Sequence, residues 1–288
     1  MHALKAKIES KGIPLKQWDI SIYRGVLTGY NPAFIIDTQT RDSILKKCSK
    51  KADSIINGKS EFERTKELIK PILRGRDIKR YSYKWAGVWL INTHNGYKID
   101  SKTKIPPINI DEYPALKAHL DRFYPKISKR TDKGITPYNL RNCAYLQDFE
   151  KQKISWQRVT QEPRFILESD FYLLDSMAFI ISYSQDELYY LLGFLNSKLI
   201  FYYFKHIGHL YSNKGFLLSN QYVEKFPVPK AKDIDQNIHD KIIALVKEIL
   251  ETKSRDSKTN TKHLESKLDS VIYKLYALTP DEIKLIES

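Results

Sequence analysis

The stretch SQDELYYLLGFLNSKLIFYYF, residues 184–204, contains the longest apolar run of this chain and locates its predicted core. Ser184 and Glu187 form a capping box, in which the hydroxyl and the carboxylate each satisfy a free backbone N–H at the start of a helix. The apolar run from Leu188 to Phe204 is short for a membrane span and is interrupted by polar residues. We therefore expect a helix that is buried on most sides inside a folded domain.

Strands are expected on the N-terminal side of this helix. Short apolar runs bounded by turn residues lie at 33–36, 88–91, 153–156, 164–167, 171–174 and 177–181. A short helix is expected at 111–122, helical character within 38–70, and an irregular basic segment at 126–145. The sequence therefore predicts an α/β (mixed α+β) domain, in which helices pack on a mixed sheet.

Two heptad patterns follow on the C-terminal side. The first comprises Ile238, Ile242, Leu245 and Ile249, and the second comprises Leu264, Leu268, Val271, Leu275 and Leu278. The polar residues 251–261 between them predict a turn, so we expect an antiparallel helical hairpin. Thr279 to Glu282 is a capping signal for a last short helix. This C-terminal part either packs simply on the main domain or serves as a spacer or docking element.

The charge of the chain is strongly one-sided. Its 288 residues carry 48 Lys and Arg against 34 Asp and Glu, a formal net charge of +14. Residues 1–164 hold 33 basic and 17 acidic side chains, whereas residues 165–288 hold 15 and 17. Because cations that neutralise phosphates release condensed counterions, a basic half of this kind favours binding to a polyanion.

The cysteines and the N-terminus indicate the compartment. The two cysteines, Cys48 and Cys143, show neither the spacing of a metal site nor a disulfide framework. The first residues lack the apolar core of a signal peptide. We expect a cytoplasmic protein that has no membrane partner.

Signatures of catalysis are missing from the sequence. None of the 11 glycines forms a nucleotide-binding or methyl-donor loop, and the chain lacks an Asn or Asp followed by two prolines and an aromatic residue. No histidine pair has the spacing of a helical metal site. Glu168, Asp170 and Asp175 are the nearest approach to a magnesium-dependent nuclease cluster. We therefore predict no catalytic residue, no metal and no cofactor in this chain.

Two windows combine basic, aromatic and glycine residues. Residues 64–104 hold 11 basic and 3 acidic side chains, and residues 117–164 hold 11 and 5. Arginine forks suit guanine or phosphate, asparagine and glutamine suit adenine, and lysine suits phosphate. The residues predicted to bind DNA are Arg74, Arg76, Lys79, Arg80, Lys129, Arg130, Lys133, Tyr138, Asn139, Arg141, Gln157 and Arg158, with Asn213 and Lys214 from a third, smaller loop.

Seven stretches, in order, resemble the TaqI-like C-terminal specificity (target-recognition) domain of adenine-specific DNA methyltransferases and type IIG restriction-modification enzymes. They are WDISIYRGVLTGYNPAFIID (18–37), LRGRDIKRYSYKW (73–85), RTDKGITPYNLRNC (130–143), KISWQR (153–158), LLGFLNSKLIFYY (191–203), QYVEKFPVP (221–229) and LDSVIYKLYALTPDEIKLIE (268–287).

The resemblance implies a module that binds double-stranded DNA and faces a methyltransferase domain, in cis or in trans. S-adenosylmethionine would bind that domain and not this chain. The corresponding division is a linker from a missing upstream region at 1–17, a DNA target-recognition domain at 18–230 and a C-terminal helical hairpin at 231–288.

Two other hypotheses remain open at this stage. One is a stand-alone restriction endonuclease or methyltransferase with a hidden site. The other is a specificity subunit that docks a separate methyltransferase through its C-terminal helices.

Overall fold

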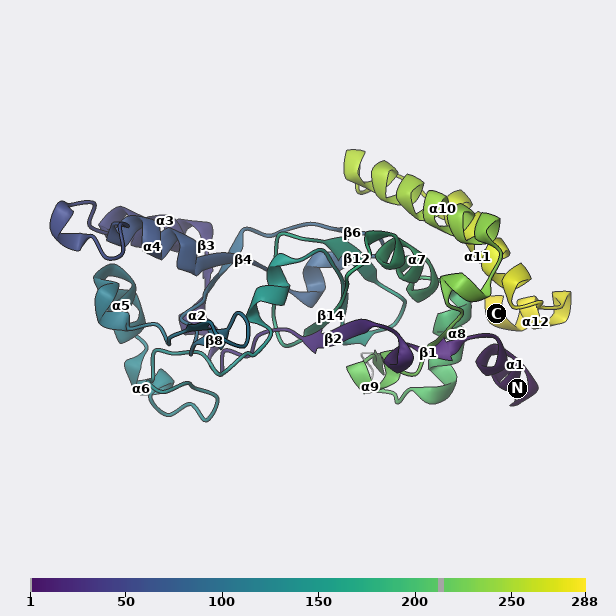
Figure 1. Cartoon of the computed structure of the whole chain (residues 1–288), viewed down its shortest axis with the longest axis horizontal. Coiled ribbons are helices and arrows are strands. Elements are labelled where there is room, and N and C mark those ends of the chain that lie inside the picture. Colours follow the sequence, from purple (N-terminus) through teal and green to yellow (C-terminus); the bar gives the residue numbers. More distant parts are fainter. Residues whose placement is uncertain (1, 212–214) are drawn as a thin grey trace.

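A four-stranded antiparallel sheet lies at the centre of the molecule (Figure 1). Its strands, in spatial order, are β12 (Phe165–Glu168), β10 (Lys153–Gln157), β14 (Met177–Ser182) and β2 (Ile20–Arg24). In the computed structural model, which describes residues 2–211 and 215–288, a lobe of short helices lies at one end of the long axis and a bundle of longer helices at the other. The mixed α/β fold predicted from the sequence is confirmed.

Side chains of the central sheet serve two separate hydrophobic cores. Along β14, Ala178 and Ile180 belong to the core beneath the C-terminal helices, whereas Met177, Phe179 and Ile181 belong to the core of the other lobe. Successive side chains of a strand point to opposite faces, and residues 177–181 of β14 are all apolar because both faces of the strand are covered.

The long apolar run forms two helices where we expected one. α7 (Gln185–Leu195) ends at Asn196, and α8 (Lys198–Ile207) begins after Ser197, whose side chain accepts a hydrogen bond from the Ile200 N–H. Asn196 is fully buried, and its amide bonds to both the N–H and the carbonyl of Phe165 in β12. A polar pair that looked like a mere interruption therefore ends one helix, caps the next and attaches both to the sheet.

A second sheet organises the other lobe. Its order is β13 (Tyr172–Leu173), β4 (Ile69–Leu73), β7 (Val88–Ile91) and β3 (Ile35–Asp37), and the β13–β4 pair is parallel. The strand expected at 33–36 is partly wrong, because Pro32 lies in the first turn of α2 (Asn31–Phe34) and the strand begins only at Ile35. The helices beside this sheet are α3 (Thr38–Lys47), α4 (Glu61–Leu68), α5 (Pro114–Asp121) and α6 (Tyr124–Ile127).

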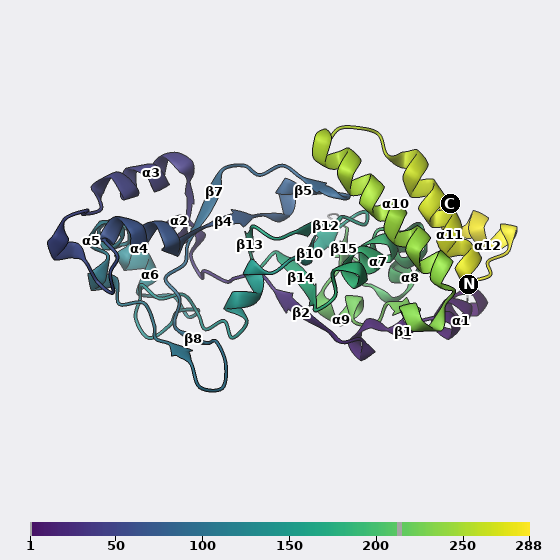
Figure 2. The same cartoon turned by 45° about the horizontal axis from the view of Figure 1, so that its top comes forward.

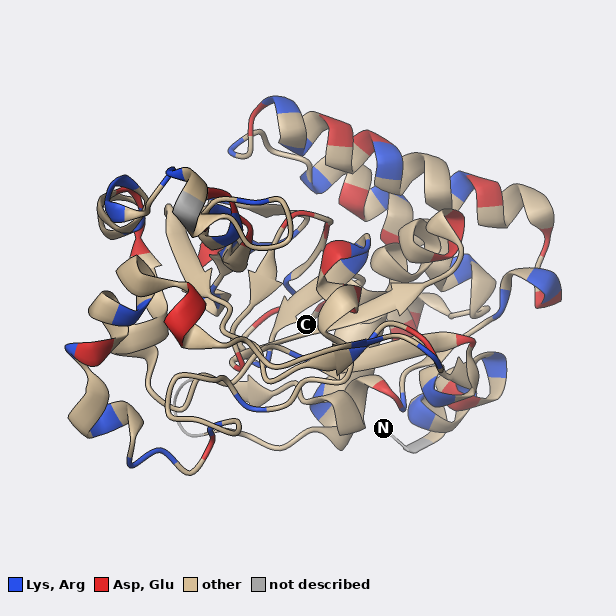
Figure 3. Cartoon of the chain, turned by 60° about the vertical axis from the view of Figure 1, so that its left-hand side comes forward, with Lys and Arg blue, Asp and Glu red and all other residues tan. Residues whose placement is uncertain are grey.

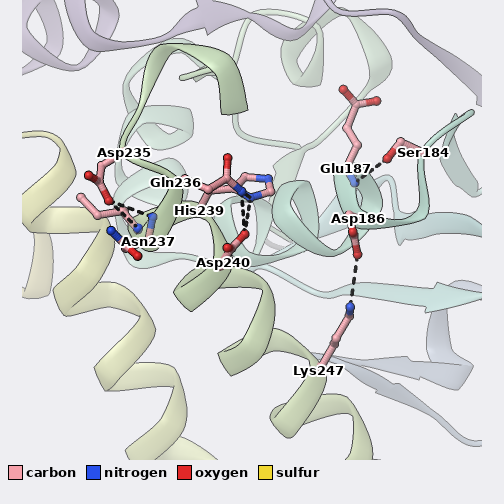
Figure 4. Close-up of polar contacts among 10 residues, drawn as sticks. Ser184, Asp186, Glu187, Asp235, Gln236, Asn237, His239, Asp240 and Lys247 are labelled. Carbon is pink, nitrogen blue, oxygen red and sulfur yellow. Dashed lines mark hydrogen bonds and ion pairs between the residues drawn. The ribbon is translucent and has the colours of Figure 1, made fainter.

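The predicted C-terminal helical hairpin is present. α10 (Gln236–Arg255) and α11 (Lys262–Leu275) pack on each other and on α7 across the end of the molecule (Figure 2). A Cβ built on Gly193 of α7 would lie 3.1 Å from Val246, so glycine permits the close approach of α10. Asp235 caps α10, and the Lys247 ammonium lies 3.2 Å from the Asp186 carboxylate (Figure 4). α12 (Pro280–Glu287) follows, with the expected capping box.

The N-terminal residues are packed against these helices. In α1 (His2–Lys11), Leu4 and Ile8 are buried, and the Lys7 ammonium lies 2.6 Å from the Glu282 carboxylate of α12. β1 (Ile13–Pro14) then pairs with β16 (Pro227–Val228). Residues 2–17 are thus packed against the C-terminal helices, and the two termini lie at the same end of the molecule (Figures 1 and 2). The domain division stays a prediction.

Short elements complete the structure. They are β5 (Ile78–Lys79), β6 (Ser82–Tyr83), β8 (Tyr97–Lys98), β9 (Lys104–Ile105), β11 (Val159–Thr160), β15 (Phe216–Leu217) and α9 (Asn220–Val223). Within residues 2–211 and 215–288, no helix combines the length and the apolarity needed to cross a bilayer.

Candidate nucleic-acid interface

The two basic windows meet at a glycine. Gly75 begins a short 3₁₀ helix, η3 (Gly75–Asp77), and a Cβ added to it would lie 2.7 Å from the Gln157 side chain at the end of β10. Any larger residue at position 75 would have to displace the Gln157 side chain. The contact brings the exposed Arg76 of the first window next to the end of β10 in the second window.

Arg74, at the start of this turn, is already paired. Its guanidinium donates to both carboxylate oxygens of Asp77, at 3.0 and 2.8 Å, and this hydrogen bonding raises the pKa of Arg74 above its usual value. A two-point contact of this kind uses the fork geometry that a guanine edge would require. Arg74 can therefore contact a base in that way only if Asp77 releases it.

Two arginines lie close together at the end of the central sheet. Arg24 is exposed at the end of β2, and Arg158 is half-buried after β10. Burial lowers the pKa of Arg158, and the nearby positive charge of Arg24 lowers it further. Neither guanidinium forms a salt bridge within the described parts of the chain, and Arg158 donates only to the backbone carbonyl of Asp175, at 3.2 Å. The nearby Asp175 carboxylate opposes this lowering of the Arg158 pKa without forming a salt bridge. Two guanidinium groups beside one carboxylate leave a net positive site, which favours binding to an anion.

Polar groups surround this pair. Arg24 and Arg158 line a cavity of about 290 Å³ together with Leu217, Ser219, Asn220 and Gln221. Asn220 and Gln221 lie in α9, beside β2, and sequence analysis did not identify them or Arg24. The only sequence signal at Arg24 is its position before a turn glycine, because the pairing of strands distant in sequence creates the site.

Arg141 extends the same surface. It is exposed, makes a single contact of 3.3 Å with the Asp132 carboxylate, and lines a second cavity together with Arg24. We call Arg24, Arg141 and Arg158 the arginine strip. Its three residues come from three separate segments of the sequence. Arg141 and Arg158 are among the predicted DNA-binding residues, and Arg24 is not.

The structure contradicts the DNA-binding prediction for Arg130 and Asn139. Arg130 is 6% exposed, and burial lowers its pKa to about 10. Asn139 is fully buried and donates to the Ile108 carbonyl at 2.9 Å. The Arg130 guanidinium donates to the backbone carbonyls of Thr28, Asp132, Pro137 and Asn139. Both side chains satisfy backbone carbonyls that hold the 128–142 segment against neighbouring loops, and they are too buried to contact a duplex.

The other predicted residues are not joined to the arginine strip by any contact in the described ranges. Arg80 lies 2.8 Å from the Glu265 carboxylate of α11, and Lys79 beside it is exposed. Lys129 is exposed, Lys133 donates to the Ser128 carbonyl at 2.7 Å, and Tyr138 donates to Asp121 at 2.5 Å. Asn213 and Lys214 lie outside the described residues.

The carboxylates considered for a nuclease do not form a cluster. Glu168 is buried, lies 3.1 Å from the Lys153 ammonium, and accepts hydrogen bonds from Ser155 and the Phe171 N–H. Asp170 is exposed on the following turn. Among residues 2–211 and 215–288, no group of three His, Cys, Asp or Glu side chains is arranged to hold a metal ion.

The charge of the C-terminal helices differs from that of the strip. Figure 3 shows positive and negative positions alternating along α10 and α11, which is the pattern of a solvated helix face. The surplus of positive charge therefore belongs to the loops and sheet ends of the first 164 residues.

Comparison with known proteins shows the family of this chain. A family model described as the TaqI-like C-terminal specificity domain matches residues 70–228, which is more than half of the chain. The type II methyltransferase M.MjaIV of Methanocaldococcus jannaschii is 26% identical over 255 residues, covering 86% of this chain and 76% of that protein.

Two solved structures share the fold. One is the type IIG restriction endonuclease BpuSI, with a TM-score of 0.50 and 16% identity over 96% of this chain. The other is the type IIL restriction-modification enzyme MmeI in complex with DNA, with a TM-score of 0.57 and 12% identity over 94% of this chain. The chain spans about a third of each, 33% and 35% of their lengths.

Proposed function

Because the chain belongs to the family of TaqI-like C-terminal specificity domains, we propose that it recognises a specific sequence in double-stranded DNA for an adenine-specific methyltransferase or restriction-modification enzyme. The proposal gives this chain the task of binding and reading the duplex. It assigns the chemical step to a methyltransferase domain, in cis or in trans, and the binding of S-adenosylmethionine to that domain. Solved relatives that include a DNA complex support a duplex as the partner.

The observation that carries the proposal is the adjacent pair of Arg24 and Arg158, which form no salt bridge within the described residues. Like charges repel, and a bound anion would offset this repulsion more fully than the nearby Asp175 carboxylate does. Phosphate oxygens of a DNA backbone fit two adjacent guanidinium forks, each of which can bind in a two-point manner. In this proposal the pair fixes the position of the duplex against the end of the central sheet.

Neighbouring side chains would then contact the bases. Gln157 directly precedes Arg158, and Asn220 lines the same cavity as the pair; both are amides, which suit the two-point pattern of adenine in the major groove. Arg76 is exposed beside the end of β10 and suits guanine. Contacts to phosphates set register without sequence information, so specificity in this proposal depends on Gln157, Asn220 and Arg76.

The experiment measures affinity for a mixed-sequence duplex as a function of salt. Each phosphate contact contributes about 0.9 to the slope of log K against log salt, so the double variant Arg24→Gln/Arg158→Gln should lower the slope by about 1.8. The matched control is Lys262→Gln/Lys267→Gln, which removes two exposed charges from α11 and should leave the slope unchanged. Equal slopes for the wild type and the arginine variant would refute the proposed interface.

A further inference from the structure

A cavity of about 380 Å³ lies beneath the arginine strip. It lies between the end of β2, the loop after β7 and the 140–146 segment, and its walls include Arg24, Asn92, His94, Arg141 and Tyr145. Its volume is in the range of small-ligand sites, which are typically concave and contain a few convergent polar groups. The charged groups of its lining are Arg24, Arg141 and the carboxylate of Asp175, so positive charge exceeds negative charge, and the buried Asn92 also lines a second cavity.

Asn92 is the unusual feature of this wall. It is 3% exposed, and within the described chain its side-chain amide has no hydrogen-bond partner, with Oδ1 fully buried. Buried polar side chains are nearly always bonded, so the Asn92 amide needs a partner from outside the chain, which a water or a ligand in the cavity would supply. An amide offers one donor and one acceptor side by side, the pattern that pairs with the edge of a nucleobase.

His94 adds a second polar group without adding charge. Burial lowers its pKa to about 4, so the ring is neutral at physiological pH. Its Nδ1 accepts a hydrogen bond from the Gly96 N–H at 3.2 Å, which places the ring proton on Nε2. Tyr145 contributes an aromatic wall that is held rigidly, because its ring stacks on Tyr23 at a centroid distance of 4.1 Å.

We propose that this cavity binds a single nucleotide, with the base against Asn92 and the phosphate between Arg24 and Arg141. In this arrangement the base bonds to the Asn92 amide and packs on the aromatic ring of Tyr145. The phosphate accepts hydrogen bonds from the two guanidinium groups. The nucleotide has two possible sources, a nucleotide extruded from bound DNA or a free deoxynucleoside monophosphate. The first source rests on the proposed function, whereas the second does not.

The first arm of the test measures binding of the four deoxynucleoside monophosphates to the full chain by calorimetry and ligand-observed NMR. We expect binding that depends on the base and is weakened about tenfold or more by Asn92→Leu, which keeps the volume and removes the amide. Because Asn92→Leu removes an unsatisfied buried group, it should fold at least as well as the wild type. Gln147→Leu is the matched control, an equivalent change on the wall of the neighbouring cavity, and should leave binding unchanged.

The second arm uses a mismatched duplex with 2-aminopurine at the mismatch, a base that becomes fluorescent when it leaves the stack. A rise in 2-aminopurine fluorescence with the wild type that is lost in Asn92→Leu identifies DNA as the source. Binding of monophosphates that depends on Asn92, without such a rise in fluorescence, identifies the free nucleotide. Equal results for the wild type and Asn92→Leu in both arms overturn the inference. Salt-dependent duplex binding separates the two proposals, because it tests the proposed function whether or not the cavity binds a nucleotide.

Discussion

The buried ion pair between Lys153 and Glu168 allows a quantitative test of how the central sheet is held together. Both side chains are fully buried on adjacent strands, with 3.1 Å between the ammonium and the carboxylate. Lys153 also donates to the Phe149 carbonyl at 2.6 Å, and Glu168 accepts from Ser155 and Phe171. The perturbation is a double-mutant cycle with Lys153→Met and Glu168→Leu, which preserve the approximate volume and remove the charge.

Each single variant leaves one charge buried without its partner and should lower the free energy of unfolding by about 3–5 kcal/mol. The double variant leaves no buried charge. It costs only about 1–3 kcal/mol, because the Ser155 hydroxyl and the Phe171 N–H lose their acceptor. The two singles sum to about 6–10 kcal/mol, so the coupling energy should be at least about 3 kcal/mol.

Urea unfolding followed by tryptophan fluorescence measures all four proteins, since Trp156 is fully buried in the same strand as Lys153. Asp170→Asn, an exposed carboxylate two residues from Glu168, is the control and should change stability by less than about 0.5 kcal/mol. If the double variant is as unstable as the sum of the two single variants, the coupling energy is zero. That result would show that Lys153 and Glu168 do not stabilise each other as an ion pair. Loss of magnesium-dependent DNA cleavage in a stable Glu168→Leu protein would instead restore the nuclease hypothesis.

Three further predictions concern stability. Arg130→Lys cannot reproduce the contacts to four carbonyls and should cost about 1.5–3 kcal/mol in urea unfolding, while the salt slope of DNA binding stays as in the wild type. Burial raises the pKa of Asp269 from 3.8 to about 6, so its folded state favours the proton. Protonated Asp269 therefore contributes about 3 kcal/mol to the free energy of unfolding below pH 4, and this contribution is lost as the pH rises through 6. Asp269→Asn should remove this pH dependence, which unfolding measurements across that range would detect. Gly25→Ala would place a Cβ 1.9 Å from the Leu174 carbonyl oxygen, so the melting temperature should fall by at least several degrees, and an unchanged value would show that the backbone there adjusts freely.

Local patterns predicted much of the fold. The capping box at Thr279, the two heptad seams and most of the strand candidates appear in the structure near their expected bounds, since each depends on residues close in sequence. The capping box predicted at Ser184 forms only in part: the Ser184 hydroxyl accepts from the Glu187 N–H, but the Glu187 carboxylate accepts from the Ser182 hydroxyl and not from the Ser184 N–H. The division of the apolar run at Asn196 was not predicted, because the bonds that end the helix there go to Phe165, 31 residues away. Tertiary contacts therefore decide details that propensity leaves open.

The candidate site was harder to predict for the same reason. Composition indicates a surplus of positive charge, but it does not show which arginines are used inside the fold. Arg130 donates to several backbone carbonyls, whereas Arg158 donates to one and keeps other N–H groups for an anion. Arg24 was missed because only the pairing of β2 with β14 brings it to the end of the sheet where Arg158 lies.

The alternation of side chains along β14 limits how a protein of this kind can diverge. Inserting or deleting one residue there would exchange the side chains of the two cores at once, so neither half could relax while the other stayed intact. Loops that leave the ends of the sheet face no such penalty and are free to lengthen, shorten or change composition. Efforts to transplant new sequence preferences onto this scaffold should therefore exchange the loops whole and keep the length of the strand fixed.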